Sequence, residues 1–315
     1  MRIGAAQLRP RWLDKAGTVR KVIEAIGQAA AQDVQLLAFP EAFLSGYPFW
    51  LCRTNAAAFD EPLQKQAYAQ FLDAAVEVPS AEIAQIVETC RDHKVSIFLG
   101  ANERGSQIGR GSIYCAMIAI DAESGVRGVH RKLVPTFDER LCWSPGDGNG
   151  MKAHAFDGVR VGALNCWENW MPFPRFAMYA SGEDVHIAAW PGNAAVAGVA
   201  PQFIAREGRV YVVSVMGLLS LADIPDDFAL KPELAAQDET DFFTGGTVIV
   251  APTGELIAEA ASGEETIVTA EIDLAAVRGE RQNFDVSGHY NRPDVFDFSV
   301  SRRRPGPVDQ ADDEN

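Results

Sequence analysis

The sequence is poor in basic residues. It has 28 lysines and arginines against 43 aspartates and glutamates, and its formal net charge is −15 over 315 residues. A chain this acidic is a poor match for nucleic acid or an anionic membrane surface, because both are polyanions. It also lacks a hydrophobic run of membrane-spanning length, and residues 1–8 turn polar too soon for a signal peptide. We therefore expect a cytoplasmic protein, with no nucleic-acid or membrane partner, whose partner is a small molecule.

Metal-binding and disulfide patterns are also missing. The five histidines show neither H-x-x-x-H nor H-E-x-x-H spacing, and the five cysteines contain no C-x-x-C pair. Zinc sites and disulfide frameworks use such spacings and even numbers of cysteines. Neither G-x-G-x-x-G nor G-x-x-x-x-G-K-[ST] occurs, so no nucleotide-binding loop is indicated. The sequence therefore predicts no metal and no cofactor. The cysteines are Cys52, Cys90, Cys115, Cys142 and Cys166.

Apolar residues are abundant, and their spacing predicts an α/β protein. They make up 47% of the chain, which is enough for a large core. Residues 2–8 are predicted as a strand, residues 14–32 as a helix capped by Asp14, and residues 34–40 as a strand buried on both faces. Similar βα and ββ units recur and indicate two similar halves packed as a sandwich. We expect one domain over residues 1–300 and a charged, disordered tail over residues 301–315.

Further elements follow from periodicity and from β-branched runs. The expected helices are residues 54–76, 80–94, 173–181 and 201–209. The expected strands are residues 95–100, 112–120, 126–133, 185–191, 210–215, 247–251 and 266–272, and a Gly-rich hairpin joins the first two. Residues 221–244 are polar and poorly periodic, which indicates a surface excursion or a subunit contact. Residues 143–150 form a Gly-rich loop of the kind that lines active sites.

Residues 158–172 combine a short apolar run, a cysteine and a polar, aromatic-rich turn. The apolar run predicts a buried strand that ends at Cys166, and Pro172 suits the first turn of a helix. A thiol at such an elbow faces backbone amides that would lower its pKa and stabilise an oxyanion. The alternative is that this lone cysteine is a small buried hydrophobe. The polar neighbours favour the reactive interpretation; they are Asn165, Glu168 and Asn169.

Two charged segments occur where an ordinary core would be apolar. Glu41 follows the predicted buried strand 34–40, and a carboxylate there is costly unless it is paired or functional. A solvated loop glutamate is the alternative. The basic run 130–132 could also be solvated. Because it is bounded by apolar residues in an acidic chain, we expect at least one of its cations to point inward toward a carboxylate.

Three stretches together resemble the nitrilase superfamily of carbon–nitrogen hydrolases, and more closely its nitrilase branch. They are residues 39–48 (FPEAFLSGYP), residues 130–136 (HRKLVPT) and residues 164–172 (LNCWENWMP). Supporting matches lie at residues 138–140, 146–148, 188–191, 245–246 and 288–294. The resemblance runs from about residue 2 to about residue 300, and three motifs in this order are highly specific.

The resemblance implies a fold and a set of roles. The fold is a four-layer α-β-β-α sandwich that dimerises into an eight-layer assembly, often within larger homo-oligomers, without metal or organic cofactor. Cys166 matches the nucleophile, Glu41 the general base and Lys132 the cation that stabilises the tetrahedral intermediate. Glu139 matches a second glutamate that positions substrate and assists proton transfer. The chain departs from many relatives at Phe137, where histidine is frequent, and has little of the C-terminal extension linked to filaments.

These residue types suit nitrile hydrolysis. A nitrile carbon is a weak electrophile, so it calls for a thiolate, a base that removes the thiol proton and a cation that offsets developing charge. We expect a nitrilase that converts organic nitriles, aromatic or arylaliphatic, to carboxylic acid and ammonia through a thioimidate and a thioester. Aromatic side chains could line the substrate pocket, although core packing is the alternative for each. They are Tyr47, Phe137, Trp167, Trp170 and Trp190.

Other functions stay open at this point. An amidase, a carbamoylase or a cyanide-hydrolysing enzyme would share the fold, but the Cys-Trp-Glu-Asn turn favours nitriles, because amidase branches generally lack Trp after the cysteine. A non-catalytic oligomeric binding protein is the alternative from another class. The presence of all four candidate catalytic residues argues against it.

Overall fold

Two six-stranded sheets form the centre of the molecule. The computed structural model describes residues 1–105 and 109–305. The first sheet has the order β14 (Thr266–Glu271), β1 (Arg2–Gln7), β2 (Leu36–Ala38), β3 (Ser96–Arg104), β4 (Ile113–Asp121) and β5 (Gly125–Arg131). The second has the order β13 (Leu256–Glu259), β12 (Val248–Val250), β9 (Tyr211–Met216), β8 (Val185–Trp190), β7 (Val159–Asn165) and β6 (His154–Phe156). In each, neighbouring strands run parallel at the centre: β1, β2 and β3 in the first, β7, β8 and β9 in the second.

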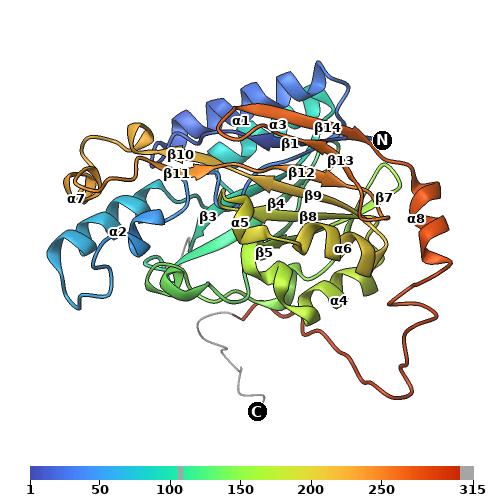
Figure 1. Ribbon diagram of the computed structural model, residues 1–315. Helices are drawn as coiled ribbons and strands as arrows, with labels where there is room; N and C mark the ends of the chain where they lie inside the picture. Colours follow the sequence, from blue (N-terminus) through green and yellow to red (C-terminus); the bar gives the residue numbers. More distant parts are fainter. Residues whose placement is uncertain (106–108, 306–315) are drawn as a thin grey trace, which may run out of the picture.

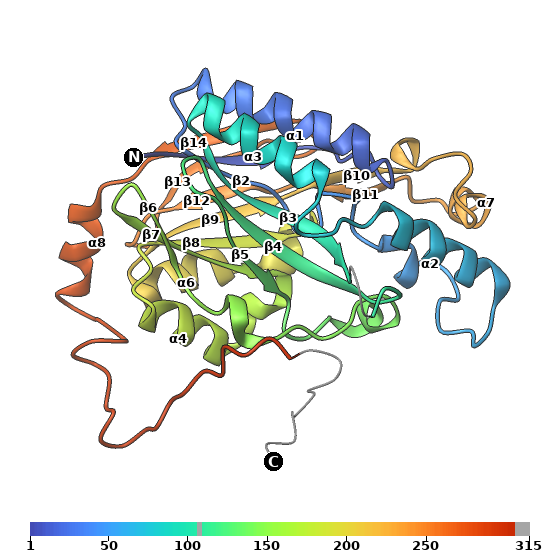
Figure 2. The same ribbon diagram turned by 180° about the vertical axis from the view of Figure 1, so that it is seen from behind.

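Helices cover the outer face of each sheet. On the first sheet lie α1 (Lys15–Ala30) and α3 (Ala81–His93), and on the second lie α4 (Pro172–Ala180) and α6 (Ala200–Gly208), as Figure 1 and the reverse view in Figure 2 show. Asp14 caps α1 by accepting from the backbone N–H of Gly17 at 2.8 Å, as its position predicts. The predicted four-layer α-β-β-α sandwich is therefore confirmed. The eight-layer dimer stays a prediction.

Apolar side chains fill the space between the two sheets. Ile3 and Phe98 from the first sheet belong to the same buried cluster as Val161, Ile187 and Val213 from the second. Because strand residues alternate between faces, the opposite sides of these strands pack on the helices. The two sheets are thus held face to face, and polar residues that follow their strands are brought to a common edge.

Several boundaries differ from the sequence prediction. Helix α2 spans only Pro62–Ala74, because Pro62 occupies a first-turn position and Glu61 provides the cap, so residues 54–61 are not part of it. Short elements were not predicted: α5 (Ala194–Ala197), α7 (Lys231–Ala235), α8 (Leu274–Arg281), β6, β13 and the two-stranded pair β10 (Leu218–Ser220) and β11 (Asp241–Thr244). Their few residues carry too little periodicity to be recognised. The predicted hairpin tip at residues 106–108 lies outside the described residues.

The segment 221–244 projects from one end of the sandwich beside α2 (Figure 1), as expected of a surface excursion, but several of its residues are buried. Phe228, Leu234 and Phe242 are buried in one cluster with Trp12 and Trp50. The Trp12 and Phe228 rings meet edge to face at 4.8 Å between centroids. Widely spaced apolar residues, invisible to a periodicity search, therefore anchor this segment. Its use as a subunit contact is untested.

The Gly-rich loop and the start of the tail both lie against β5. The backbone N–H of Gly146 donates to the carbonyl of Lys132 at 2.8 Å. Arg304 pairs with Asp147 at 2.9 Å and donates to the carbonyl of Val129 at 2.7 Å, so this part of the tail is attached to the body. The tail beyond residue 305 lies outside the described residues. Among the described residues, no helix has the length and apolar character needed to cross a membrane.

Candidate active site

Cys166 lies at the predicted elbow between a strand and a helix. It follows β7 directly and begins the short 3-10 helix η4 (Cys166–Trp170), and its side chain is buried. Its φ of +48° belongs to the left-handed region, which a non-glycine residue adopts only when its surroundings hold it there. The Nδ2 of Asn169 donates to the carbonyls of Leu164 and Cys166 at 3.2 and 2.9 Å, which fixes this turn.

Two further buried polar side chains, His186 and Glu183, hold Asn169 in place. The Oδ1 of Asn169 lies 2.8 Å from Nε2 of His186, and Nδ1 of His186 lies 3.0 Å from Glu183. Because the amide N–H groups of Asn169 are committed to two carbonyls, its Oδ1 must accept, so Nε2 of His186 carries the proton. Burial raises the pKa of Glu183. The turn at Cys166 is thus held by hydrogen bonds through Asn169 to His186 of β8 and Glu183, and not by apolar packing alone.

Glu41 lies just beyond β2, at the same end of the sandwich as Cys166. Its carboxylate is buried, and its backbone N–H donates to the carbonyl of Trp190 at 3.3 Å, which links the two sheets. Gly100 makes room for this turn, because a Cβ there would lie 1.9 Å from the carbonyl oxygen of Pro40. The alternative of a solvated loop glutamate is therefore wrong.

Lys132 directly follows β5 and is the cation of the basic run that points inward. Its Nζ donates to Oε1 of Glu41 at 2.9 Å and to Oε2 of Glu139 at 2.7 Å, and its side chain is 1% exposed. Glu139, on the 3-10 helix η2 (Phe137–Leu141), also accepts from the hydroxyl of Tyr47 at 2.8 Å and from the N–H of Thr136 at 2.6 Å. Lys132 is therefore held by two carboxylates in a dry environment.

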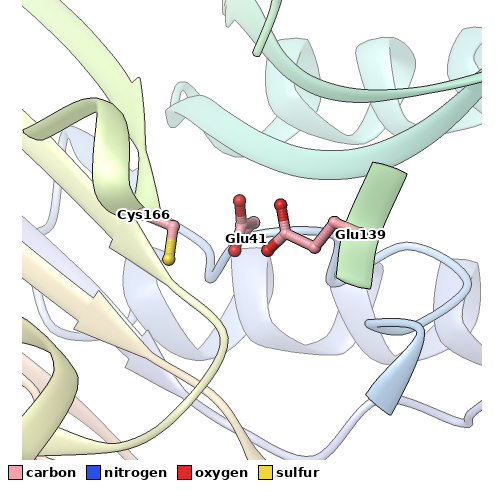
Figure 3. A group of neighbouring side chains, drawn as sticks. All are labelled: Glu41, Glu139 and Cys166. Carbon is pink, nitrogen blue, oxygen red and sulfur yellow. The ribbon is translucent and has the colours of Figure 1, made fainter. Parts of the chain in front are cut away.

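Glu41, Glu139 and Cys166 converge on one point. One carboxylate oxygen of each glutamate and the Cys166 sulfur all lie within 4.8 Å of one another. Figure 3 shows the three side chains reaching into the same space from different elements. Such a set has suitable donor atoms for a metal ion, but the Lys132 ammonium already lies between the two carboxylates and supplies the positive charge.

Burial dominates the protonation of these groups. It raises the pKa of Glu41 from 4.5 to about 7, with Lys132 opposing the shift and Glu139 adding to it. It also raises the pKa of the Cys166 thiol, and Glu41 adds to that rise, so the expected lowering by backbone amides is outweighed. Burial alone would lower the pKa of Lys132, but Glu41, Cys166 and Glu139 together raise it. A protonated thiol therefore lies beside a carboxylate that titrates near neutral pH.

The expected aromatic residues have different surroundings. Trp190 is fully buried in the core cluster that contains Cys166, so it packs behind the site. Phe137 and Trp167 are 79% and 52% exposed. Tyr47 is half-buried, with its hydroxyl on Glu139 and its ring against Trp143 and Phe243. A cavity of about 10 Å³ adjoins Glu41, Tyr47 and Phe243, room for about one water molecule.

Some site residues were not assigned a role by sequence reasoning. The Cys115 thiol, on β4 beside β5, donates to Oε1 of Glu41 at 3.3 Å. His130 and Glu168 form a buried pair at 3.0 Å between the Lys132 and Cys166 segments. Both lie within the recognised motifs, and that proximity in sequence was the available signal. Cys115 had none, because a cysteine in an apolar strand looks like core.

Comparison with known proteins identifies the family of this chain. The carbon-nitrogen hydrolase family model matches residues 2–282. The chain is 32% identical to an aliphatic nitrilase of Rhodococcus rhodochrous (98% of this chain and 85% of that protein), and 33% identical to an aliphatic nitrilase of Sinorhizobium fredii strain HH103 (98% and 97%). It is 32% identical to an arylacetonitrilase of Trametes versicolor (94% and 93%).

Solved structures show the same fold at lower sequence identity. A carbon-nitrogen hydrolase from Helicobacter pylori G27 superposes with a TM-score of 0.71 at 19% identity, covering 94% of this chain and 96% of that one. Nit3 of Saccharomyces cerevisiae, a member of the nitrilase superfamily, gives a TM-score of 0.67 at 19% identity, covering 93% and 97%. The chain therefore belongs to the carbon–nitrogen hydrolase family, the nitrilase superfamily, and is a hydrolase that acts on carbon–nitrogen bonds.

Proposed function

We propose that this protein hydrolyses organic nitriles to carboxylic acids and ammonia, with Cys166 as the nucleophile. The observation that carries the proposal is the buried Lys132 held between Glu41 and Glu139, beside the Cys166 thiol. The similarity to three nitrilases over more than nine-tenths of the chain supports the nitrile as substrate.

The first step is proton transfer from Cys166 to Glu41. With a pKa of about 7, Glu41 is partly ionised at neutral pH and can accept the thiol proton. The thiolate then attacks the nitrile carbon, a carbon–sulfur bond forms, and the electron pair of one C–N π bond moves to nitrogen. That nitrogen takes a proton from Glu41, which gives a neutral thioimidate. Lys132 stabilises the negative charge that develops.

Two waters complete the reaction. The first adds to the thioimidate carbon with Glu41 as base, and the tetrahedral adduct expels ammonia and leaves a thioester. The second adds to the thioester, and collapse of that adduct releases the carboxylic acid and returns the proton to the Cys166 sulfur. Glu139 holds Lys132 through its 2.7 Å contact, and Tyr47 fixes Glu139 in turn. The sum is one nitrile and two waters to one acid and one ammonia.

We assign the substrate side chain to the aromatic or arylaliphatic class. Tyr47, Phe137 and Trp167 are not fully buried, and such rings suit contact with an aryl group. Trp190 shapes the site from behind, because it is packed in the core. The cavity that adjoins Glu41, Tyr47 and Phe243 has a volume of only about 10 Å³, so a substrate that entered there would have to move the side chains that line it.

The active form is proposed to be a homodimer or larger homo-oligomer. Large apolar side chains are exposed on and beside α4 and α6, the outer layer of the second sheet. They are Trp170, Phe173, Val199 and Phe203. An exposed apolar face of this kind marks a contact surface. Analytical ultracentrifugation tests it: a monomer at micromolar concentration would contradict the proposal.

The reaction is tested by ammonia release from a substrate panel. The panel is phenylacetonitrile, mandelonitrile, benzonitrile, an aliphatic dinitrile, cyanide and the matching amides. Ammonia from nitriles but not amides is expected, with aryl substrates preferred. Cys52→Ala, which alters an exposed cysteine, is the matched control for Cys166→Ala. Ammonia from amides alone would indicate an amidase, and no ammonia from any compound would indicate a binding protein.

A further inference from the structure

Glu168 is a buried carboxylate that the proposed reaction does not use. It lies two positions after Cys166 on η4, and its side chain is fully buried. Its two oxygens contact the segments that carry two different catalytic residues. A buried charge with this many partners has a structural or functional reason to be kept, because its desolvation is costly.

Each Glu168 oxygen accepts from a backbone N–H next to a catalytic residue. Oε1 accepts from the N–H of Leu133, which follows Lys132, at 2.7 Å. Oε2 accepts from the N–H of Asn165, which precedes Cys166, at 3.0 Å. The two amides lie at the ends of strands from different sheets, since Leu133 follows β5 and Asn165 ends β7. One rigid carboxylate therefore connects the lysine segment to the nucleophile elbow.

His130 completes this connection. Its Nε2 lies 3.2 and 3.0 Å from Oε1 and Oε2 of Glu168, so it donates to both oxygens and fixes the carboxylate plane. Burial alone would raise the pKa of Glu168, but His130 and the amides of Leu133 and Asn165 outweigh it and lower the pKa. Glu168 is therefore ionised at neutral pH, with both oxygens free to accept.

The lysine segment, residues 130–132, packs against backbone on the side away from Cys166. A Cβ on Gly150 would lie 2.3 Å from Cα of His130, so the 3-10 helix η3 (Gly148–Gly150) packs directly against this strand. Arg131, between His130 and Lys132, faces a different partner and pairs with Glu103 at 2.7 Å. The lysine segment is thus supported from behind and held toward Cys166 by Glu168.

We propose that Glu168, oriented by His130, is a positioning residue that holds Lys132 at its working distance from Cys166 and Glu41. The inference rests on the proposed function for the roles of Lys132 and Cys166. Glu168 touches no reacting atom; it acts through the two amides. Displacing a catalytic group by about 1 Å lowers the reaction rate by about 100-fold. Loss of the Glu168 hydrogen bonds should therefore have a measurable effect on the rate.

Glu168→Gln is the decisive variant, because it keeps the shape and removes one acceptor. The glutamine N–H₂ must face either the amide of Leu133 or the amide of Asn165, and two donors cannot bond. One of the two hydrogen bonds by which residue 168 connects the Lys132 segment to the Cys166 turn is therefore lost. We expect kcat to fall about 10- to 100-fold with KM changed less than about threefold, because Lys132 acts on the transition state.

A second readout needs no substrate. Iodoacetamide labelling of Cys166, followed by peptide mass spectrometry, reports the reactivity of the thiol beside Glu41 and Lys132. We expect Glu168→Gln to slow labelling of Cys166 about tenfold or more. Labelling of the exposed Cys52 should stay unchanged. If wild-type protein hydrolysed no nitrile while Glu168→Gln still slowed Cys166 labelling, the proposed function would fail and this inference would stand.

The pH profile separates positioning from a general loss of stability. Glu41 faces Lys132, Glu139, Cys115 and Cys166. If Lys132 moves away from Glu41 in Glu168→Gln, it no longer lowers the Glu41 pKa. The acidic limb of the kcat/KM profile should therefore move to higher pH in this variant. Glu103→Gln is the matched control: it breaks the partly buried ion pair between Glu103 of β3 and Arg131, the residue before Lys132, and should lower stability without moving the limb.

Two results would overturn the proposal. The first is a folded Glu168→Gln protein with wild-type kcat and wild-type Cys166 labelling. If Glu168→Gln does not fold, two variants of His130 test the proposal instead. His130→Gln keeps a donor toward Glu168 and should retain activity within about threefold, whereas His130→Leu loses the donor and should lose about tenfold. A folded His130→Leu protein with wild-type kinetics is the second contradicting result.

Discussion

Replacing Glu41 with glutamine should abolish activity and, at neutral pH, stabilise the fold. The carboxylate is buried, and the fold raises its pKa from 4.5 to about 7. At about 1.4 kcal/mol for each pKa unit, keeping Glu41 ionised costs the folded state about 3 kcal/mol. This cost already includes the attraction of Lys132, which opposes the shift.

The variant has a smaller cost of its own. Lys132 loses a charged partner at 2.9 Å but keeps Glu139 at 2.7 Å, and the amide oxygen of glutamine can still accept from it. We therefore expect a net gain of about 1–3 kcal/mol in the free energy of unfolding above about pH 7. Hydrolysis should fall at least about 100-fold, because the proposed general base is gone.

The pH dependence has a definite sign. Below about pH 4.5, Glu41 is protonated in both the folded and unfolded states, so its ionisation contributes no difference. Between about pH 4.5 and 7 the unfolded state releases the proton first, and wild-type protein loses stability relative to Glu41→Gln. Above about pH 7 the difference is constant.

Urea unfolding at about pH 5, 6, 7 and 8 measures this difference. The exposed Glu24→Gln is the control for an isosteric change without burial, and it should match wild type at every pH. A free-energy difference between Glu41→Gln and wild type that did not change between about pH 5 and 8 would refute the reasoning. It would show that Glu41 ionises at its ordinary pKa and is not poised as a base near neutrality.

Three further changes test separate parts of the structure. Cys166→Ala should abolish ammonia release, with unfolding close to wild type, because the change removes one atom; residual turnover above a few per cent would remove Cys166 from its proposed role. Lys132→Met leaves Glu41 and Glu139 buried without their cation, so the free energy of unfolding should fall by about 3–5 kcal/mol at neutral pH and recover as acid protonates the carboxylates; equal losses at about pH 5 and 8 in urea titrations would contradict this. Phe228→Ala should cost about 3–5 kcal/mol in the same titration if residues 221–244 are anchored by their buried rings, whereas a loss below about 1 kcal/mol would indicate a loosely attached segment.

Local features of the chain could be predicted from the sequence because their causes are local. A cap at Asp14, apolar periodicity in α1 and an apolar run that stops at Cys166 each depend on neighbouring residues alone. The same holds for the three motifs that indicate the superfamily. Fold class and candidate catalytic residues could therefore be predicted before the structure was known. Short strands and the true start of α2 could not, because a few residues carry no periodicity.

Surface exposure was harder to predict, since it depends on partners far along the chain. Trp190 and Trp167 have the same residue type and both adjoin strand ends, yet one is fully buried and the other is 52% exposed. Residues 221–244 have a polar composition, but Phe228 and Phe242 meet Trp12 and Phe49 across the fold. Composition averages over such contacts and does not reveal them.

The sequence by itself determined which residue types were available for chemistry and at which strand ends they occur. Only the tertiary structure decided that Lys132 lies between Glu41 and Glu139, because Glu41 and Lys132 are 91 positions apart. It alone brought the Glu168 oxygens to amides at strand ends of two sheets and raised the pKa of Glu41 through burial. Distance and desolvation are properties of the packed chain, so only folding brings these residues into contact and shifts their pKa values.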